Sequence, residues 1–432
     1  MDAVDYYRAT APTTQAHAAL EGTVECDTCV VGGGFAGVNT ALGLAERGQG
    51  GVVLLEAARV GRGASGRNGG FVFGGFSRGE DRLLADLGPV RARALYAGTT
   101  DAVELIRSRI DRYGIDCERT DAGVLWANWF RDPEVLRTRQ RLLSEHFGVE
   151  WKWVPREALR AQLHTARYTD ALFEPRAFHF HPLKYLQGIA RTAAGLGVQL
   201  HEQSPATALH RDGSGWRIDT PAGSVRARRV VLACGGYLAG LCAKVDAGVL
   251  PIATYAMATE PLDDRLQTVM STQAAVYDTR FAFDYYRPMA DTRLLWGGRI
   301  SIVDRDPEEV ARLLKDDLLK VFPQLVGIRI DHAWSGLMSY ARHEMPQLGQ
   351  IEDNLWLAQA FGGHGVAPTT FAGELLASAI AEADPRWREL SDYGLVSALK
   401  PAGFAAAQLR YWWLQCLDAW KDWRERTLPG RH

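Results

Sequence analysis

The feature that most constrains this chain is a glycine-rich turn between an apolar strand and a helix near its N-terminus. The apolar run C-D-T-C-V-V is followed by Gly32, Gly34 and Gly37 in the spacing G-x-G-x-x-G, and then by the helical pattern V-N-T-A-L-G-L-A-E-R. The first glycine permits the turn, the second lets a pyrophosphate approach the backbone at a helix N-terminus, and the third lets the helix pack closely on the strand. A second apolar strand ends in Glu56, about 20 residues further on, where a carboxylate can bind a ribose hydroxyl. The sequence therefore predicts a Rossmann-like α/β domain that binds a dinucleotide.

A second glycine-rich segment follows this acidic residue, where a typical NAD site would continue into ordinary alternation of strand and helix. The segment A-A-R-V-G-R-G-A-S-G-R-N-G-G places five glycines between residues 61 and 70. Glycine is favoured where the backbone takes positive φ or lies very close to a flat or bulky group. Arg67 and Asn68 add a fixed charge and an amide that can reach phosphate or ring heteroatoms. The segment therefore favours FAD, with the isoalloxazine end of the cofactor lying along it.

Length and charge exclude several classes of function. The 432 residues suffice for about two or three domains, and a formal net charge of −2 offers no general attraction for nucleic acid or anionic lipid. We see no signal-peptide pattern and no apolar run near the roughly 20 residues of a membrane helix. We therefore expect a cytoplasmic protein with small-molecule partners, without a nucleic-acid partner or membrane association, and of an oligomeric state that the sequence leaves open.

The cysteines do not indicate a disulfide framework or a metal site. Six cysteines are few for a chain of this length. Cys26 and Cys29 form a C-x-x-C, but both lie in the first predicted strand, where residues three apart point to opposite faces. We expect them to be buried strand residues, and we expect no metal.

The two glycine-rich segments together with Glu56 resemble the D-amino-acid oxidase family of FAD-dependent amine and amino-acid oxidoreductases. Further segments are similar to the gamma-glutamylputrescine oxidoreductase branch of that family: F-H-F-H-P-L-K-Y, D-Y-Y-R-P-M-A-D-T-R-L-L-W-G-G, M-P-Q-L-G and G-H-G-V. The resemblance extends over nearly the whole chain. It implies an FAD-binding domain of the glutathione-reductase type and a second, mixed-sheet α+β substrate domain.

The resemblance also implies how the chain is divided. We expect a discontinuous FAD-binding domain, a substrate domain that forms a roof over the flavin, and a C-terminal aromatic helix. The expected ranges are 24–76, 170–243 and 332–385 for the FAD-binding domain, 77–169 and 244–331 for the substrate domain, and 400–427 for the helix.

The cofactor contacts expected from these motifs lie in five segments. In the family, the strand near Ala206 contacts the adenine, and the helix that follows Val366 directs its positive dipole end toward the pyrimidine side of the flavin. Family members that attach FAD through a thioether use a cysteine that this chain lacks between Cys242 and Cys416, so we expect noncovalent FAD. The expected FAD contacts are Gly32, Gly34, Phe35, Ala36, Gly37, Glu56, Ala57, Arg62, Gly63, Ala64, Ser65, Arg67, Asn68, Gly69, Gly70, Ala206, Ala233, Gly235, Gly363, His364, Gly365 and Val366.

The chemistry implied by the resemblance is oxidation of a C–N bond. The carbon next to a neutral amine gives hydride to flavin N5, the imine hydrolyses to an aldehyde and an amine or ammonia, and O2 or another acceptor reoxidises the flavin. Gamma-glutamylputrescine or a related polyamine is the expected substrate. Two alternatives stay open: oxidation of a D-amino or N-methyl amino acid, which a buried arginine paired to the carboxylate of the substrate would favour, and a flavin-binding protein without turnover.

Three side chains are the catalytic candidates. Arg67 lies in the glycine-rich segment, and His364 is expected either to pack under the cofactor or to act in the active site. Strand alternation places Tyr285 and Tyr286 on opposite faces, so only one can point into a pocket. We expect this residue to be Tyr286, the alternative being that both tyrosines lie in a core.

A tryptophan-rich helix is predicted at the C-terminus. Its apolar stripe is able to contact a membrane interface, another subunit or the surface of its own domain. Mixed charges on its other face disfavour the membrane, and we expect the stripe to cover the domain surface. The stripe consists of Trp412, Trp413, Leu417, Trp420 and Trp423.

Overall fold

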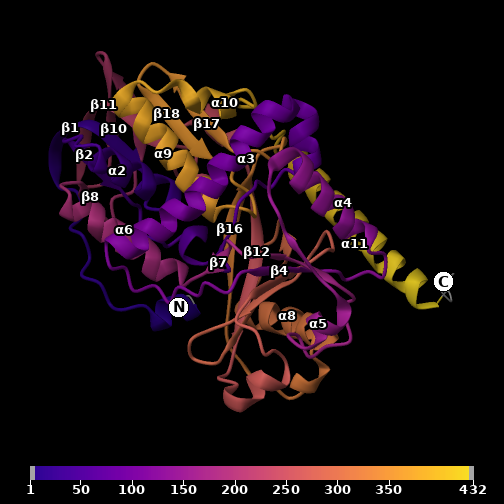
Figure 1. Cartoon of the computed structure of the whole chain (residues 1–432). Helices are drawn as coiled ribbons and strands as arrows, with labels where there is room; N and C mark the ends of the chain where they lie inside the picture. The colour runs from indigo at the N-terminus through magenta and orange to yellow at the C-terminus, as the bar shows by residue number, and fades with distance from the viewer. Residues whose placement is uncertain (1–4, 428–432) are drawn as a thin grey trace.

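The computed structural model describes residues 5–427 and contains two eight-stranded sheets joined by several crossings of the chain (Figure 1). The first sheet has a parallel centre, in which β1 pairs with both β11 and β2, and antiparallel strands at one edge and in a side arm. Its strands are β1 (Gly22–Val31), β2 (Val52–Leu55), β8 (Gln199–His201), β9 (Ala208–Asp212), β10 (Gly215–Asp219), β11 (Gly223–Leu232), β17 (Gln347–Glu352) and β18 (Leu355–Gln359).

The second sheet is mixed, because β13 and β4 pair in parallel while the other neighbouring strands are antiparallel. It lies below the first sheet in Figure 1. A separate two-stranded ladder, β3 (Phe71–Val72) with β7 (Phe178–His179), lies beside the glycine-rich segment. In spatial order the second sheet contains β16 (Ile330–Tyr340), β12 (Leu250–Thr259), β15 (Leu294–Ser301), β14 (Tyr285–Pro288), β13 (Ala275–Asp278), β4 (Val124–Ala127), β6 (Ala171–Glu174) and β5 (Lys152–Val154).

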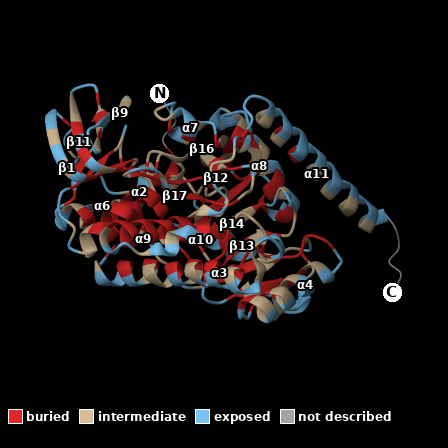
Figure 2. Cartoon of the chain, turned by 90° about the horizontal axis from the view of Figure 1, so that it is seen from above, coloured by how far each residue is buried: buried red, intermediate tan, exposed pale blue. Residues whose placement is uncertain are grey.

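Helices cover both sheets. The helices α2 (Phe35–Glu46), α3 (Glu80–Arg112), α6 (Pro182–Gly195) and α9 (Val366–Glu382) pack together with the first sheet, and α8 (Pro307–Val321) packs on the second. The shorter helices are α1 (Tyr6–Thr10), α4 (Glu134–Leu142), α5 (Arg156–Arg160), α7 (Ala243–Asp246) and α10 (Arg388–Ser391). The long α11 (Ala402–Thr427) runs along the second sheet toward the edge of the molecule (Figures 1 and 2).

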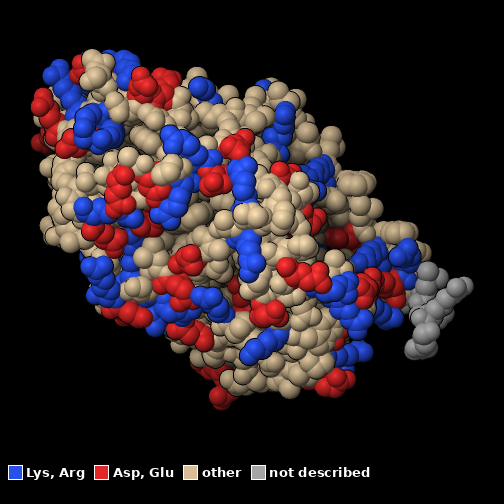
Figure 3. Space-filling view, turned by 45° about the horizontal axis from the view of Figure 1, so that its top comes forward, with Lys and Arg blue, Asp and Glu red and all other residues tan. Residues whose placement is uncertain are grey.

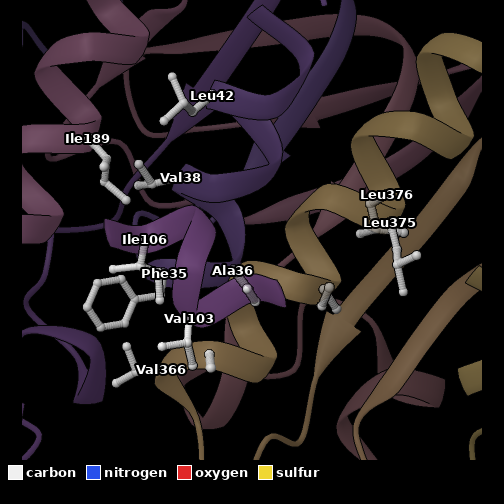
Figure 4. Packing of buried hydrophobic residues seen from close by; sticks show 14 of the residues in the cluster. Phe35, Ala36, Val38, Leu42, Val103, Ile106, Ile189, Val366, Leu375 and Leu376 are labelled. Carbon is white, nitrogen blue, oxygen red and sulfur yellow. The ribbon is translucent and has the colours of Figure 1, made fainter. Parts of the chain in front are cut away.

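The main core lies between α2, α3, α6 and α9, which are red over most of their packed faces in Figure 2. Phe35 and Val38 of α2 lie near Val103 of α3, Ile189 of α6 and Val366 of α9 (Figure 4). The close approach of α2 and α9 depends on glycine, because a Cβ at residue 373 would lie 2.6 Å from the Cβ of Asn39. The predicted helix after G-x-G-x-x-G is therefore the centre of the core.

A buried ion cluster ties three of these helices together. Arg109 of α3 contacts Glu46 of α2 and Glu374 of α9, each at 2.5 Å, and donates a hydrogen bond to Asn39 Oδ1 at 2.8 Å. Burial opposes ionisation of Glu46, but the hydrogen bond and the charge of Arg109 outweigh it and lower the pKa of that carboxyl. The cluster fixes the relative positions of α2, α3 and α9.

The expected chain division differs from the observed arrangement at three points, one of which is α3, expected in the substrate domain but packed with α2, α6 and α9. Residues 170–243 and 332–385 were both expected in the cofactor domain, yet β6 and nearly all of β16 belong to the second sheet. The sheet that a strand joins is decided by its pairing partners, which the local composition does not show. The division into an FAD-binding and a substrate domain stays a prediction. No helix within residues 5–427 is long and apolar enough to span a bilayer.

Candidate active site

A cavity of about 1590 Å³ lies where the carboxyl ends of the parallel strands meet the second sheet. Val31, Leu55, Ala233 and Ala358 line it, and each lies at or just after the carboxyl end of β1, β2, β11 or β18. Ligands of open α/β sheets bind outside the carboxyl ends of the strands. Much of the opposite wall comes from β12 to β16 and from the first turns of α11.

The first glycine turn has the geometry of a pyrophosphate site. Gly32 has φ +115° and a Cβ there would lie 2.6 Å from the Ala233 carbonyl oxygen, while a Cβ at Gly37 would lie 2.0 Å from the Gly32 carbonyl oxygen. The Glu56 carboxylate accepts hydrogen bonds from the backbone N–H groups of Gly33 at 2.7 Å and Ala58 at 2.9 Å. Burial raises the pKa of Glu56, and these N–H groups oppose that rise. Backbone donors and a fixed carboxylate fit the pyrophosphate and ribose of a dinucleotide.

Hydrogen bonds connect the second glycine-rich segment to the first glycine turn and to the second sheet. Ser65 Oγ accepts a hydrogen bond from the Phe35 N–H at 2.9 Å, and Asn68 Oδ1 accepts one from the Gly70 N–H at 2.8 Å. Arg67 donates to the Ser335 carbonyl oxygen of β16 at 3.1 Å, and its Nε lies 3.5 Å from Asp5 Oδ2. The segment thus closes one side of the cavity and brings Arg67 to its wall.

The expected cofactor contacts lie together in this cavity with two exceptions. Gly37 packs beneath the first turn, and Gly70, with φ +77°, packs against the Phe180 carbonyl oxygen. All the other expected contacts line the cavity, including Ala206 and the turn from Gly363 to Val366 at the N-terminus of α9. The helix dipole there favours negative charge at the cavity.

His364 is neutral and hydrogen-bonded. Its Nε2 lies 2.8 Å from the Gly74 carbonyl oxygen, and since a carbonyl can only accept, Nε2 carries the proton. Burial lowers its pKa to about 4, with help from the positive charge of Arg139. Its ring packs edge-on against Phe73 at 4.1 Å, so His364 both lines the cavity and holds the Phe73–Gly74 backbone.

The expectation for the tyrosine pair of β14 is wrong. Tyr286 is fully buried in the core of the second sheet, where its ring stacks on Trp296 at 4.5 Å. Tyr285 faces the cavity instead, beside two glycines: a Cβ at Gly69 or at Gly297 would lie 2.6 or 2.1 Å from its ring. Tyr286 is therefore a core residue, and Tyr285 is the tyrosine of this pair that points into the cavity.

Tyr285 belongs to a group of aromatic side chains that we call the aromatic chamber. Phe73 stacks on Tyr277 at 5.7 Å, and Tyr277 stacks on Trp126 at 6.3 Å. Tyr285 contacts Phe71 and Phe283 edge-on or tilted. The sequence alone does not bring these rings together, because Trp126 and Tyr277 meet through the parallel pairing of β4 with β13. The chamber consists of Phe71, Phe73, Trp126, Tyr277, Phe283 and Tyr285, all of which line the cavity.

The charged groups next to the chamber are paired with one another. Arg139 contacts Glu80 at 2.7 Å and lies over the Trp126 ring at 4.7 Å. Arg299, which lines the cavity, contacts Asp317 at 2.6 Å, and Arg280 contacts Asp278 at 2.6 Å. Burial raises the pKa of Glu174, beneath Arg139, to about 8, although the guanidinium opposes the rise.

Fold and cavity define a flavoprotein oxidoreductase with a two-domain FAD-binding architecture. The chain belongs to the FAD dependent oxidoreductase (DAO) family, which it matches over residues 27–379. It is 36% identical to gamma-glutamylputrescine oxidoreductase of Escherichia coli over 377 residues, which cover 86% of this chain and 87% of that protein. It is 23% identical to glycine oxidase of Geobacillus kaustophilus over 87% of this chain and 98% of that protein.

Solved structures show the same fold. The crystal structure of glycine oxidase from Geobacillus kaustophilus superposes with a TM-score of 0.71 at 21% identity, covering 86% of this chain and 99% of that one. L-proline dehydrogenase from P. horikoshii superposes with a TM-score of 0.70 at 21% identity, covering 85% of this chain and 96% of that one. The chain is thus an FAD-dependent oxidoreductase acting on amine C–N groups, as the sequence motifs predicted.

Proposed function

We propose that this enzyme oxidises an amine at the end of an extended polyamine-type chain, with gamma-glutamylputrescine as the first candidate substrate. Its 36% identity to the Escherichia coli enzyme of that name supports this choice. The observation that carries the proposal is the aromatic chamber beside the glycine loop. Aromatic faces bind a neutral amine through dispersion and a distal ammonium group through cation–π attraction.

The pairing of three arginines beside the aromatic chamber favours an amine over an α-amino acid. An amino-acid oxidase needs a cation that is available to the substrate carboxylate. Arg139, Arg280 and Arg299 each contact a carboxylate of the protein itself. Recruiting one of them to a substrate would leave a carboxylate without its cation, which is costly at a buried site.

Bound FAD would supply the electron acceptor for hydride removed from the carbon next to the amine nitrogen. The chain would hold the cofactor through the Gly32–Gly34 backbone, Glu56 and the 62–69 segment, and the N-terminus of α9 would favour negative charge beside it. Tyr285 and the other chamber rings would orient the amine and exclude water. His364, neutral with Nε2–H bonded to Gly74, would keep the Phe73 ring in place.

We also propose that FAD is bound noncovalently. Cys234 is the one cysteine among the described residues that line the cavity, and its thiol lies 3.4 Å from the Val31 carbonyl oxygen. Burial raises its pKa to about 12, so it is not a thiolate at neutral pH. Acid precipitation should release all the flavin into the supernatant; flavin that stays with the pellet would overturn this.

Anaerobic reduction tests the substrate proposal. The purified yellow protein is mixed with gamma-glutamylputrescine, putrescine, spermidine, sarcosine or D-alanine, and bleaching of the flavin absorbance is followed. Rapid bleaching by the polyamine group alone supports the proposal, whereas bleaching only by sarcosine or D-alanine assigns the enzyme to amino-acid substrates. Reoxidising the bleached enzyme with O2 and, separately, with a soluble quinone then identifies the acceptor.

A further inference from the structure

The C-terminal helix α11 is amphipathic in the opposite sense from an ordinary surface helix, because its polar face is turned toward the protein. Tyr411 Oη accepts a hydrogen bond from the Ile300 N–H at 3.2 Å, and Asp418 accepts one from the Phe281 N–H at 2.9 Å. Glu425 accepts one from the Arg131 N–H at 2.7 Å. Further along, Arg167 pairs with Asp422. These contacts fix the rotation of α11 about its axis.

The apolar stripe of the helix consequently points into solvent. The expectation that it covers the domain surface is wrong, since Trp412, Trp413, Trp420 and Trp423 are 54–61% exposed. Leu409 and Leu417 on the same face are also exposed, as is Cys416. The stripe follows the spacing of a helix-pairing seam, in which apolar residues alternate three and four apart.

The exposed area is that of an interface. A tryptophan side chain can bury up to about 250 Å², so the four together leave roughly 570 Å² of aromatic surface in water. The two leucines bring the stripe close to the about 800 Å² that each partner contributes to a stable dimer. Tryptophan is also enriched at the energetic centre of interfaces.

Charge separates a protein partner from a lipid surface. A membrane-bound helix that does not cross the bilayer needs a basic polar face or a cluster of about 4–8 basic residues. Here Arg424 lies over the Trp420 ring at 4.7 Å and Arg410 pairs with Glu344 at 2.8 Å, while Asp418 and Glu425 share the helix with them. Figure 3 shows acidic and basic side chains intermixed over the visible face.

We propose that the stripe pairs with the same stripe of a second copy of this chain, antiparallel, about a twofold axis at Cys416. About this axis Leu409 meets Trp423 of the partner subunit, Trp412 meets Trp420 of the partner subunit, and the two Cys416 side chains face each other. A self-complementary patch of this kind forms a closed dimer. The opposite face of the same helix contributes to the cavity wall through Gln408 and Tyr411.

Mass measurement tests the pairing. Light scattering on the full-length holoenzyme at micromolar concentration should give twice the 47.6 kDa of the chain. Trp420→Glu should halve the mass with flavin content unchanged, whereas Val90→Glu, at an exposed apolar residue of α3, should leave the dimer intact. A monomeric wild type, or a Trp420→Glu variant that stays dimeric, overturns the proposal.

Cross-linking tests the direction of the helices. Mild oxidation should join wild-type chains through Cys416 and should fail in Cys416→Ser. The double variant Leu409→Cys, Cys416→Ser should not cross-link, because two residues seven positions from the axis lie about 21 Å apart in an antiparallel pair. Cross-linking through residue 409 would indicate parallel helices. Sedimentation of a monomer with vesicles of anionic phospholipid, abolished by Trp420→Glu, would assign the stripe to a membrane instead.

Discussion

Tyr285 and Tyr286 are adjacent on β14 and face opposite sides of the second sheet, so replacing each in turn separates the chamber from the core. We expect Tyr286→Ala to lower stability and to leave the chemistry of the folded enzyme nearly intact. We expect Tyr285→Ala to slow amine oxidation with a smaller loss of stability. The comparison is matched, because the same atoms are removed from neighbouring positions of one strand.

The magnitudes follow from the surroundings of the two rings. Tyr286 is fully buried and stacked on Trp296 at 4.5 Å. Its truncation should cost about 3–5 kcal/mol for the lost core ring, with about 0.5–1.5 kcal/mol more for the aromatic pair. Tyr285 offers one aromatic face to the cavity. Losing an amine–aromatic contact of about 0.5–2 kcal/mol should lower kcat/KM roughly 2- to 30-fold.

Two assays read the outcomes. Thermal unfolding followed by flavin release reports stability, and stopped-flow flavin reduction by the amine reports chemistry in the protein that remains folded. Tyr285→Phe is the control, since it keeps the aromatic face and should retain most of the rate. Slow reduction in Tyr286→Ala together with a normal rate in Tyr285→Ala would refute the placement of the chamber.

Three further perturbations address the cofactor site, the helix cluster and the buried carboxyl. Glu56→Ala should weaken FAD binding by about 1.5–3 kcal/mol, or roughly 10- to 150-fold, because a charged hydrogen-bond acceptor is lost. The flavin that the variant retains after gel filtration measures this loss. Arg109→Met should lower the free energy of unfolding by about 3 kcal/mol, since Glu46 and Glu374 lose their shared cation. Arg109→Lys keeps a cation at this position and should recover part of the lost free energy. Denaturant titrations measure both variants. Glu174 has a folded pKa of about 8, above its ordinary value, so its contribution is complete at low pH and is lost as pH rises through 8. Melting temperatures should therefore fall from pH 6 to about pH 9 more steeply in the wild type than in Glu174→Gln; equal slopes would contradict the assignment.

The cofactor half of the site was predictable from sequence because it is built from backbone. The turn needs positive φ at Gly32 and close approach of the backbone at Gly37, and only glycine satisfies both needs. The residue type and its spacing in the sequence therefore indicate the turn. Glu56 was found for the same reason, as it lies at a fixed distance along the chain from those glycines. The comparisons confirm the family, the fold and FAD, while the individual contacts stay predictions that the variants above test.

The substrate half was less predictable, since strand alternation gives the relation between two side chains but not their absolute direction. The register supplies the missing information: Tyr286 pairs with Trp296, and Tyr285 pairs with Gly297. Two large aromatic residues on one face indicate a core. A glycine within a strand indicates the close approach of another group. Read together, D-Y-Y-R and L-W-G-G favour Tyr285 as the residue toward the cavity, provided that the two strands are known to pair in this register.

The tryptophan stripe was misplaced for a related reason. A helical pattern shows that one face is apolar and the other polar, and the usual inference turns the apolar face inward. In α11 the polar face finds its partners on the protein, among them the exposed backbone N–H groups of Phe281 and Ile300. Those donors belong to segments more than 100 residues earlier in the chain. Only tertiary structure reveals which face has partners within the chain, and the face left over is the one that requires a partner from outside.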